Sequence, residues 1–177
     1  MTGDLGSPNT YERCSHMKKH ILYAIVENKA GVLARVATLF SARGFNIDSL
    51  AVGETEDARF SRMTIVLSGD DAVLEQVRKQ LDKLINVVKV QDFSDTPVVE
   101  RDLLLIRVNV PPEKRGEILE LVQVFRAKVV DVGQSEMIIE MAASEDKIES
   151  FIGLLRPYGI MEMARTGRVA LPRSQRT

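Results

Sequence analysis

Apolar residues along the chain follow two rhythms, one with the period of a strand and one with the period of a helix. Residues 21–26 form a continuous apolar run, which is typical of a buried strand. The next apolar positions have the spacing of one helical face: Val32, Leu33, Val36, Leu39 and Phe40. Gly44 predicts the end of this helix, because glycine readily takes the left-handed conformation of a C-cap.

The alternation continues to the end of the first half of the chain. Strands are predicted at residues 45–52, around residues 63–67 and at residues 87–90, with a polar connection at residues 54–57. A second helix carries the apolar positions Val73, Leu74, Val77, Leu81, Leu84 and Ile85. The order is β-α-β-β-α-β, the ferredoxin-like unit.

The same pattern then repeats after a short linker. Strands are predicted near residues 104–110, 128–132, 137–141 and 160–165, and helices carry Ile118, Leu119, Val122 and Phe125, then Ile148, Phe151, Ile152 and Leu155. Aligning Gly31 with Gly116 superposes Leu33 on Ile118 and Phe40 on Phe125. The predicted fold class is therefore α+β, with two tandem ferredoxin-like βαββαβ domains, each one helical layer on one antiparallel sheet.

These patterns set the expected boundaries. Residues 1–16 are polar and without periodicity, so we expect them to be disordered. Residues 17–93 form the first domain, 94–100 the linker, 101–171 the second domain and 172–177 a tail. Each unit leaves one sheet face and one sheet edge uncovered, and a second copy of the chain would cover them. We therefore expect a homodimer or larger homo-oligomer.

Composition and charge exclude several classes of partner. The formal net charge is −1, so no global positive field favours nucleic acid or an anionic membrane. The longest apolar runs are far too short to cross a bilayer, and residues 1–16 lack the apolar core of a signal peptide, so we expect a cytoplasmic chain. Cys14 is the single cysteine, which excludes an internal disulfide and a cysteine-based zinc site.

No catalytic set of residues is recognisable. The two histidines are His16, in the polar N-terminal stretch, and His20, which we expect on the surface beside a strand. Neither of the glycine-rich phosphate-loop patterns occurs. RNA-binding domains share the predicted topology, but their exposed stacking aromatics are missing, since the central strands offer only Tyr23. Arg62, on a central strand, could pair with a neighbouring acid or contact a partner subunit, and we expect the plain surface ion pair.

One loop could bind a small ligand. Residues 28–32 join the first strand to the first helix, and a helix N-terminus presents free N–H groups that can receive a carboxylate. Gly31 allows a ligand close to the backbone, and the amide of Asn28 can bind a zwitterion or cap the helix. Asn46 supplies another amide just after the same helix. From spacing alone, a helix cap at Asn28 and a plain turn at Gly31 explain the loop better.

The order of particular residues adds a further expectation. Residues 28–33 (NKAGVL), residues 39–50 (LFSARGFNIDSL), residues 61–65, residues 125–132 (FRAKVVDV) and residues 164–167 together strongly resemble the small regulatory subunit of acetolactate synthase (acetohydroxyacid synthase). The resemblance spans residues 17–171. It implies that the first domain is an ACT domain, which binds an amino-acid effector and dimerises, followed by a C-terminal domain of similar topology.

The resemblance also implies a function. The chain would be non-catalytic, would activate the large catalytic subunit, and would confer feedback inhibition by valine, sometimes with leucine or isoleucine, in branched-chain amino acid biosynthesis. It would hold no cofactor itself, whereas thiamine diphosphate, Mg and FAD are expected on the catalytic partner. In this family the effector lies between two ACT domains, which implies an effector site made of Asn28, Lys29, Ala30, Gly31, Val32 and Leu33 of one chain with Asn46 and Ile47 of the other. The alternative is a stand-alone amino-acid-sensing ACT protein that regulates another enzyme or a transcription factor.

Overall fold

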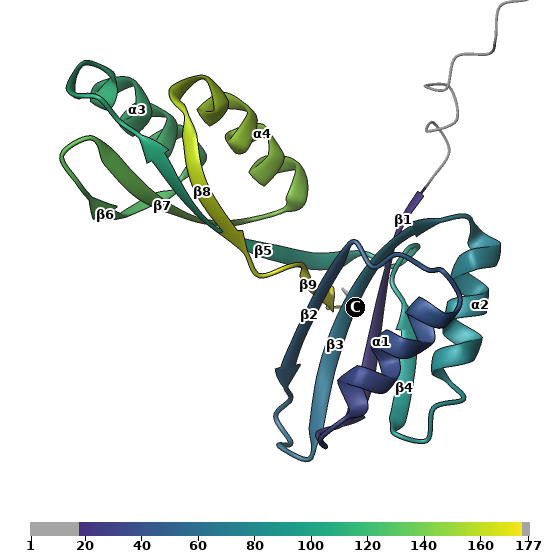
Figure 1. The fold of residues 1–177 in the computed structure, drawn as a ribbon. Coiled ribbons are helices and arrows are strands. Elements are labelled where there is room, and N and C mark those ends of the chain that lie inside the picture. Colours follow the sequence, from purple (N-terminus) through teal and green to yellow (C-terminus); the bar gives the residue numbers. More distant parts are fainter. Residues whose placement is uncertain (1–17, 175–177) are drawn as a thin grey trace, which may run out of the picture.

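A computed structural model describes residues 18–174 of the chain (Figure 1). Its first domain contains β1 (Lys18–Glu27), α1 (Val32–Ala42), β2 (Ser49–Glu54), β3 (Phe60–Gly69), α2 (Asp71–Leu81) and β4 (Val87–Asp92). The predicted order β-α-β-β-α-β is confirmed. The expectations for residues 1–16, including Cys14 and His16, lie outside the described residues.

The second domain repeats this order. It contains β5 (Val98–Asn109), the 3-10 turn η2 (Pro112–Lys114), α3 (Arg115–Phe125), β6 (Lys128–Val132), β7 (Glu136–Ala143), α4 (Glu145–Leu155), η3 (Arg156–Tyr158) and β8 (Ile160–Arg165). A short strand that the sequence did not predict, β9 (Val169–Pro172), follows and pairs with β5. The two ferredoxin-like domains of the α+β prediction are therefore present.

Each domain packs two helices against one face of an antiparallel sheet, which has four strands in the first domain and, with β9, five in the second. The strand order is β2-β3-β1-β4 in the first sheet and β6-β7-β5-β8 in the second, so β2 is an edge strand of the first sheet. Strand alternation decides which side chains enter the cores, because successive residues point to opposite faces. Leu22, Ala24 and Val26 thus pack under α1 and α2, while Leu104 and Ile106 pack under α3 and α4.

The internal alignment of the two domains is wrong by one residue in the first helix. Leu33 of α1 is 44% exposed, whereas Ile118 of α3, its predicted counterpart, is completely buried. The buried Val32 and Val36 correspond instead to the buried Ile118 and Val122. Gly31 and Gly116, on which the alignment was based, are each followed by apolar residues. Only the packing of the helix against the sheet decides which of these residues are buried.

The second domain also covers part of the first. The initial residues of β5, starting at Val98 within the predicted linker, pair with β9 to form a two-stranded ribbon. Ala170 of this ribbon packs against Tyr23 and Phe93 on the sheet face opposite α1 and α2. The rings of Tyr23 and Phe93 lie 4.7 Å apart. This face of the first sheet, which was predicted to be uncovered within one chain, is therefore covered in part by the same chain.

Two sequence-based expectations for single residues are wrong. Arg62 makes no ion pair with another residue of the described range 18–174. Its guanidinium lies 4.1 Å from the centre of the Tyr23 ring and donates a hydrogen bond of 2.9 Å to the carbonyl of Ala170. His20 is not on the surface but completely buried, with ring nitrogens 2.9 Å from the Ser94 hydroxyl and 3.1 Å from the carbonyl of Gly69. The residues that Arg62 and His20 contact are remote in sequence, so the local pattern of apolar and polar residues could not predict these contacts.

No helix among residues 18–174 is long and apolar enough to cross a membrane.

Candidate functional site

The loop between β1 and α1 forms the first half of the candidate site. Asn28, Lys29, Ala30 and Gly31 are all exposed, and Leu33 on the first turn of α1 is exposed as well. Val32 is buried and anchors the helix start in the core. The loop therefore presents backbone and small side chains to the outside while its end is fixed to the domain.

The side chain of Asn28 does not cap α1, in contrast to the simple interpretation of the sequence. Its amide nitrogen donates hydrogen bonds of 3.0 Å to a carboxylate oxygen of Glu54 and 3.0 Å to the carbonyl of Ala58. Its backbone N–H donates to the carbonyl of Arg59 over 2.7 Å. Asn28 thus ties the loop to the hairpin between β2 and β3. Sequence analysis missed Glu54 and Ala58 as supporting residues because both lie far along the chain.

Gly31 occupies the N-cap position of α1. Its φ of 82° and ψ of −8° are left-handed, and no side chain of the described residues makes a capping hydrogen bond there. A Cβ at this position would meet no atom within 4 Å. The N–H of Val32 donates to the carbonyl of Lys29 over 3.3 Å, and the N–H groups that follow it belong to an uncapped helix N-terminus, which can receive a carboxylate. Glycine is required here by the left-handed backbone rather than by crowding within this chain.

The charged side chains around the loop form ion pairs with one another, one pair in the hairpin between β2 and β3 and one beside the loop. The side chain and backbone of Arg59 donate to Asp57, and the side-chain hydrogen bond is the main cause that lowers the pKa of Asp57 to about 2. The amide of Asn86, followed by the ammonium of Lys29, lowers the pKa of Glu27. Both carboxylates are therefore ionised near neutral pH, and the loop carries fixed charges of both signs.

Asn46 and Ile47 form the second half of the candidate site, between α1 and β2. Asn46 is exposed and its amide donates a hydrogen bond of 2.9 Å to Asp48. Asp48 also accepts a hydrogen bond of 2.6 Å from Ser68 on β3. Ile47 is half-buried and packs against the core of the first domain. The amide of Asn46 is thus held at the surface by a hydrogen-bonded turn.

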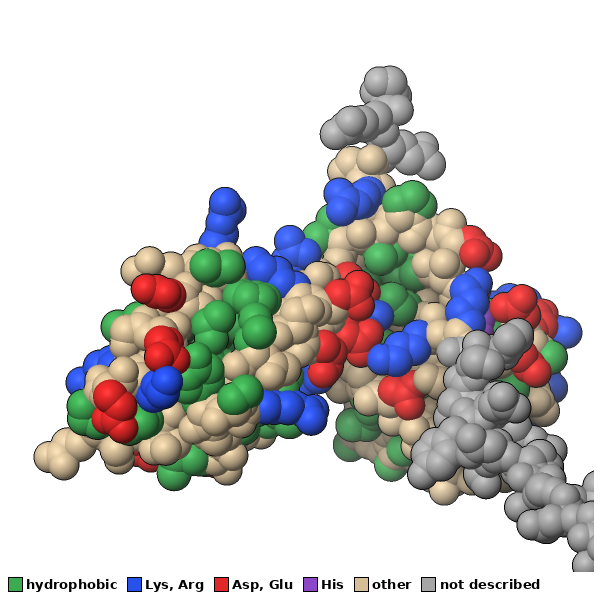
Figure 2. Space-filling model, turned by 90° about the horizontal axis from the view of Figure 1, so that it is seen from above, with side chains coloured by type: hydrophobic (Ala, Val, Ile, Leu, Met, Phe, Trp, Pro, Cys, Tyr) green, Lys and Arg blue, Asp and Glu red, His purple; other side chains and the backbone are tan. Residues whose placement is uncertain are grey.

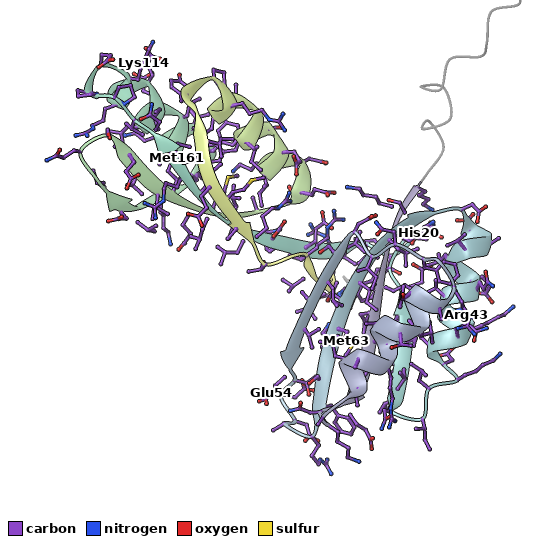
Figure 3. The ribbon with its side chains drawn as sticks, in the orientation of Figure 1. His20, Arg43, Glu54, Met63, Lys114 and Met161 are labelled. Carbon is purple, nitrogen blue, oxygen red and sulfur yellow. The ribbon has the colours of Figure 1, made fainter. Side chains whose placement is uncertain are left out.

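The two halves lie at opposite ends of α1. This helix has 11 residues, so it separates them by about 16 Å at 1.5 Å per residue. Figure 3 labels Glu54, beside the first half, and Arg43, the C-cap residue of α1, at the end that leads to the second half. One amino acid cannot contact both halves of a single chain.

No group of three or more histidine, cysteine or acidic side chains among residues 18–174 could hold a metal ion. The carboxylates at residues 54–57 lie in the hairpin, and Glu145 lies in the first turn of α4. The described part of the chain thus offers a loop that can receive a small molecule rather than an assembled set of reactive groups.

Comparisons with known proteins agree along most of the chain. A family model described as an acetolactate synthase (AHAS) small subunit-like ACT domain matches residues 22–89, and a model of the small subunit of acetolactate synthase matches residues 101–174. A protein of Archaeoglobus fulgidus named "Probable acetolactate synthase small subunit" is 58% identical over 158 residues, which cover 89% of this chain and 99% of that protein. An acetolactate synthase small subunit of Aquifex aeolicus is 51% identical, over 91% of this chain and 84% of that protein.

A solved structure has the same arrangement. The crystal structure of the acetolactate synthase small subunit from Thermotoga maritima superposes with a TM-score of 0.82 at 43% identity, over 89% of this chain and 99% of that chain. The agreement extends over both domains and over sequence as well as fold. The chain therefore belongs to the acetolactate synthase small-subunit family.

Proposed function

We propose that this chain is the non-catalytic regulatory subunit of acetolactate synthase, which activates a large catalytic subunit and makes it sensitive to feedback inhibition by valine. The names of the relatives support the proposal that this chain has a catalytic partner, since a small subunit implies a large one. Thiamine diphosphate, Mg and FAD would be held by that partner. The proposed pathway is branched-chain amino acid biosynthesis.

The position of the two half-sites relative to β2 is the observation that supports an effector site between two chains. The first half is tied to Glu54 at the end of β2, whereas the second half directly precedes Ser49 at its start. As the edge strand of the sheet, β2 can pair with another strand. Antiparallel pairing of β2 with the same strand of a second copy reverses its direction. It would bring the loop of one chain beside Asn46 of the other.

The chemistry of the joined halves suits a branched aliphatic amino acid. The N-terminus of α1 favours the effector carboxylate through its N–H groups and its positive partial charge. The side-chain oxygens of Asn28 and Asn46 can accept hydrogen bonds from the ammonium group. Ala30, Leu33 and Ile47 offer the apolar surface that a branched side chain needs. Valine is the proposed effector, sometimes with leucine or isoleucine.

Reconstitution with the large subunit tests this function. The purified chain alone should form no acetolactate from pyruvate, but it should raise the rate of the large subunit, and valine should then lower that rate. Calorimetry should show valine binding to the chain itself. If the large subunit works at the same rate with and without the chain, and valine nevertheless binds, a stand-alone amino-acid-sensing ACT protein becomes the better interpretation.

A further inference from the structure

A polar cleft of about 670 Å³ separates the two domains next to the second half of the effector site. Asn46, Ile47 and Asp48 line one wall, while Asp102, Arg165 and Arg168 line the other. Figure 2 shows acidic and basic side chains gathered where the two domains meet. The loop that would contact an effector therefore also borders the C-terminal domain.

Arg168 is the central cation of this junction. Its side chain is almost completely buried, and it bonds to Glu145 at the start of α4 and, over 3.1 Å, to Glu100 of β5. Lys19 of β1 reaches the same Glu145 over 2.7 Å. An ion pair that is shielded from water is sensitive to a change in geometry. If its two groups move apart, each is left as a buried charge without compensation. These contacts join a strand of the first domain to a helix of the second.

The backbone beside Arg168 contacts the first residue of β2, which follows the second half of the candidate site. The N–H of Arg168 donates a hydrogen bond of 2.9 Å to the hydroxyl of Ser49. Gly167, with a φ of 84°, fits so closely that a Cβ there would lie 2.8 Å from this hydroxyl and 3.3 Å from the carbonyl of Leu50. Residues 167–168 therefore fit closely against Ser49, so a movement of Ser49 would also move them.

A short series of contacts thus runs from the effector site to the second domain. Asn46 bonds to Asp48, which is followed by Ser49, and Ser49 holds Arg168, which pairs with Glu145 at the N-terminus of α4. The buried side chain of Arg168 and the close fit of Gly167 against Ser49 would pass a displacement of Ser49 on to α4, because such packing leaves little room to absorb it.

We propose that Ser49 and Arg168 form a joint through which the C-terminal domain responds to the amino acid bound at Asn46. This inference rests on the proposed function, since it assumes that an effector binds there. Both residues are positioning residues: they need not contact the effector, but its binding would favour one arrangement of the joint over another. The role assigned to the C-terminal domain is to carry that change to the catalytic partner.

Two substitutions and one matched control test the joint in the complete complex. Ser49→Ala removes the hydroxyl that holds Arg168, and Arg168→Lys keeps a positive charge but loses the fork that reaches two carboxylates. Lys128→Ala, which removes an exposed ion pair of 3.8 Å with Glu140 in the same domain, is the control. For each variant we would measure valine affinity of the free chain, activity of the complex without and with saturating valine, and backbone hydrogen exchange at residues 165–168.

The expected result separates binding from response. Both joint variants should bind valine within about threefold of the wild-type affinity and activate the partner normally. The complex should nevertheless keep most of its valine-free activity at saturating valine, because the coupling between the effector site and the partner is lost. Valine should change hydrogen exchange at residues 165–168 in the wild type and the Lys128 variant only. Full inhibition of both joint variants, or a loss of valine affinity of about tenfold or more, would overturn the proposal. A wild type that neither binds nor responds to valine would instead refute the proposed function.

Discussion

The side-chain amide of Asn28 lies 3.0 Å from the carboxylate of Glu54, and this hydrogen bond ties the start of α1 to the end of the edge strand β2. The nitrogen of this amide fixes the loop to β2. In the proposed effector site, the oxygen of the same amide would accept a hydrogen bond from the ammonium group. The geometry of the loop and that of the proposed dimer are therefore connected.

Asn28→Ala should weaken valine binding by roughly tenfold to a hundredfold, because a hydrogen bond to a charged group contributes about 1.5–3 kcal/mol. Glu54→Gln is the matched control, since its amide oxygen can still accept the hydrogen bond from Asn28, and it should retain near wild-type affinity. Calorimetric titration with valine measures both. Equal affinities of the wild type and the Asn28 variant would return Asn28 to a purely structural role.

Mixed dimers test whether the site is shared between two chains. Asn28→Ala and Asn46→Ala homodimers should each lack tight valine binding. In a dimer with one chain of each kind, one site carries both substitutions and the other carries neither, so about half of the wild-type binding capacity should return at wild-type affinity. The two chains can be co-expressed with different affinity tags and purified through both. If the mixed dimer binds no better than its parents, the two half-sites do not meet across chains.

Gly31→Ala should destabilise the fold by about 1–2 kcal/mol, because a left-handed backbone is costly for a residue with a Cβ. Space is not the cause, since nothing lies within 4 Å of the added carbon. Gly153→Ala, within helix α4 and equally uncrowded, is the control. It should stabilise by about 0.5–1 kcal/mol, since glycine is unfavourable inside a helix. Urea unfolding of both variants would reveal the opposite signs, and a stabilising Gly31→Ala would show that the loop relaxes.

Arg62→Ala should loosen the β5–β9 ribbon from the first sheet and cost about 1–3 kcal/mol, from the lost stacking on Tyr23 and the lost hydrogen bond to Ala170. Lys79→Ala on the exposed face of α2 removes only an ion pair of 3.3 Å with Glu75, so its effect should stay below about 0.5 kcal/mol. Chemical unfolding measures the two costs. Limited proteolysis between β4 and β5 should be faster in the Arg62 variant alone, and equal rates would exclude this role of Arg62.

Glu145 predicts a dependence of stability on pH. Burial, the largest influence, raises its pKa, but the Lys19 hydrogen bond and the charges of Arg168 and Lys19 together outweigh it, so the pKa lies below the usual 4.5. A lowered pKa in the folded state means that ionised Glu145 stabilises the fold above pH 4.5 and that this contribution is lost as the pH falls through the folded value.

The wild type should therefore be more stable than Glu145→Gln near neutral pH, and this difference should shrink on acidification. Urea unfolding of both proteins between about pH 3 and pH 7 measures the difference directly. A difference that grows towards acid pH would show that Glu145 is not held ionised by Lys19 and Arg168.

Local sequence was sufficient for the order of the elements. The periods of 3.6 and 2 residues depend on neighbours in the chain, so the four main helices and strands β1 to β8 could be predicted in order before any contact was known. The bounds were less exact, since β2 begins at Ser49 and not at residue 45. The exposed loop at residues 28–31 was also recognisable, because a strand followed by glycine and an apolar helix is a local signal. The order of residues in that loop pointed to the family that the comparisons then established.

Only the tertiary structure decided which residues meet. The partners of Asn28, Arg62 and His20 lie on remote elements, so no local period could reveal them. Strand β9, which runs from the end of the predicted second domain to Pro172 of the predicted tail, exists because the chain returns to pair with β5 and covers the first sheet. The joint between Ser49 and Arg168 has the same origin. Burial and hydrogen bonding depend on the packed neighbours of a residue, and chain folding, not sequence proximity, selects those neighbours.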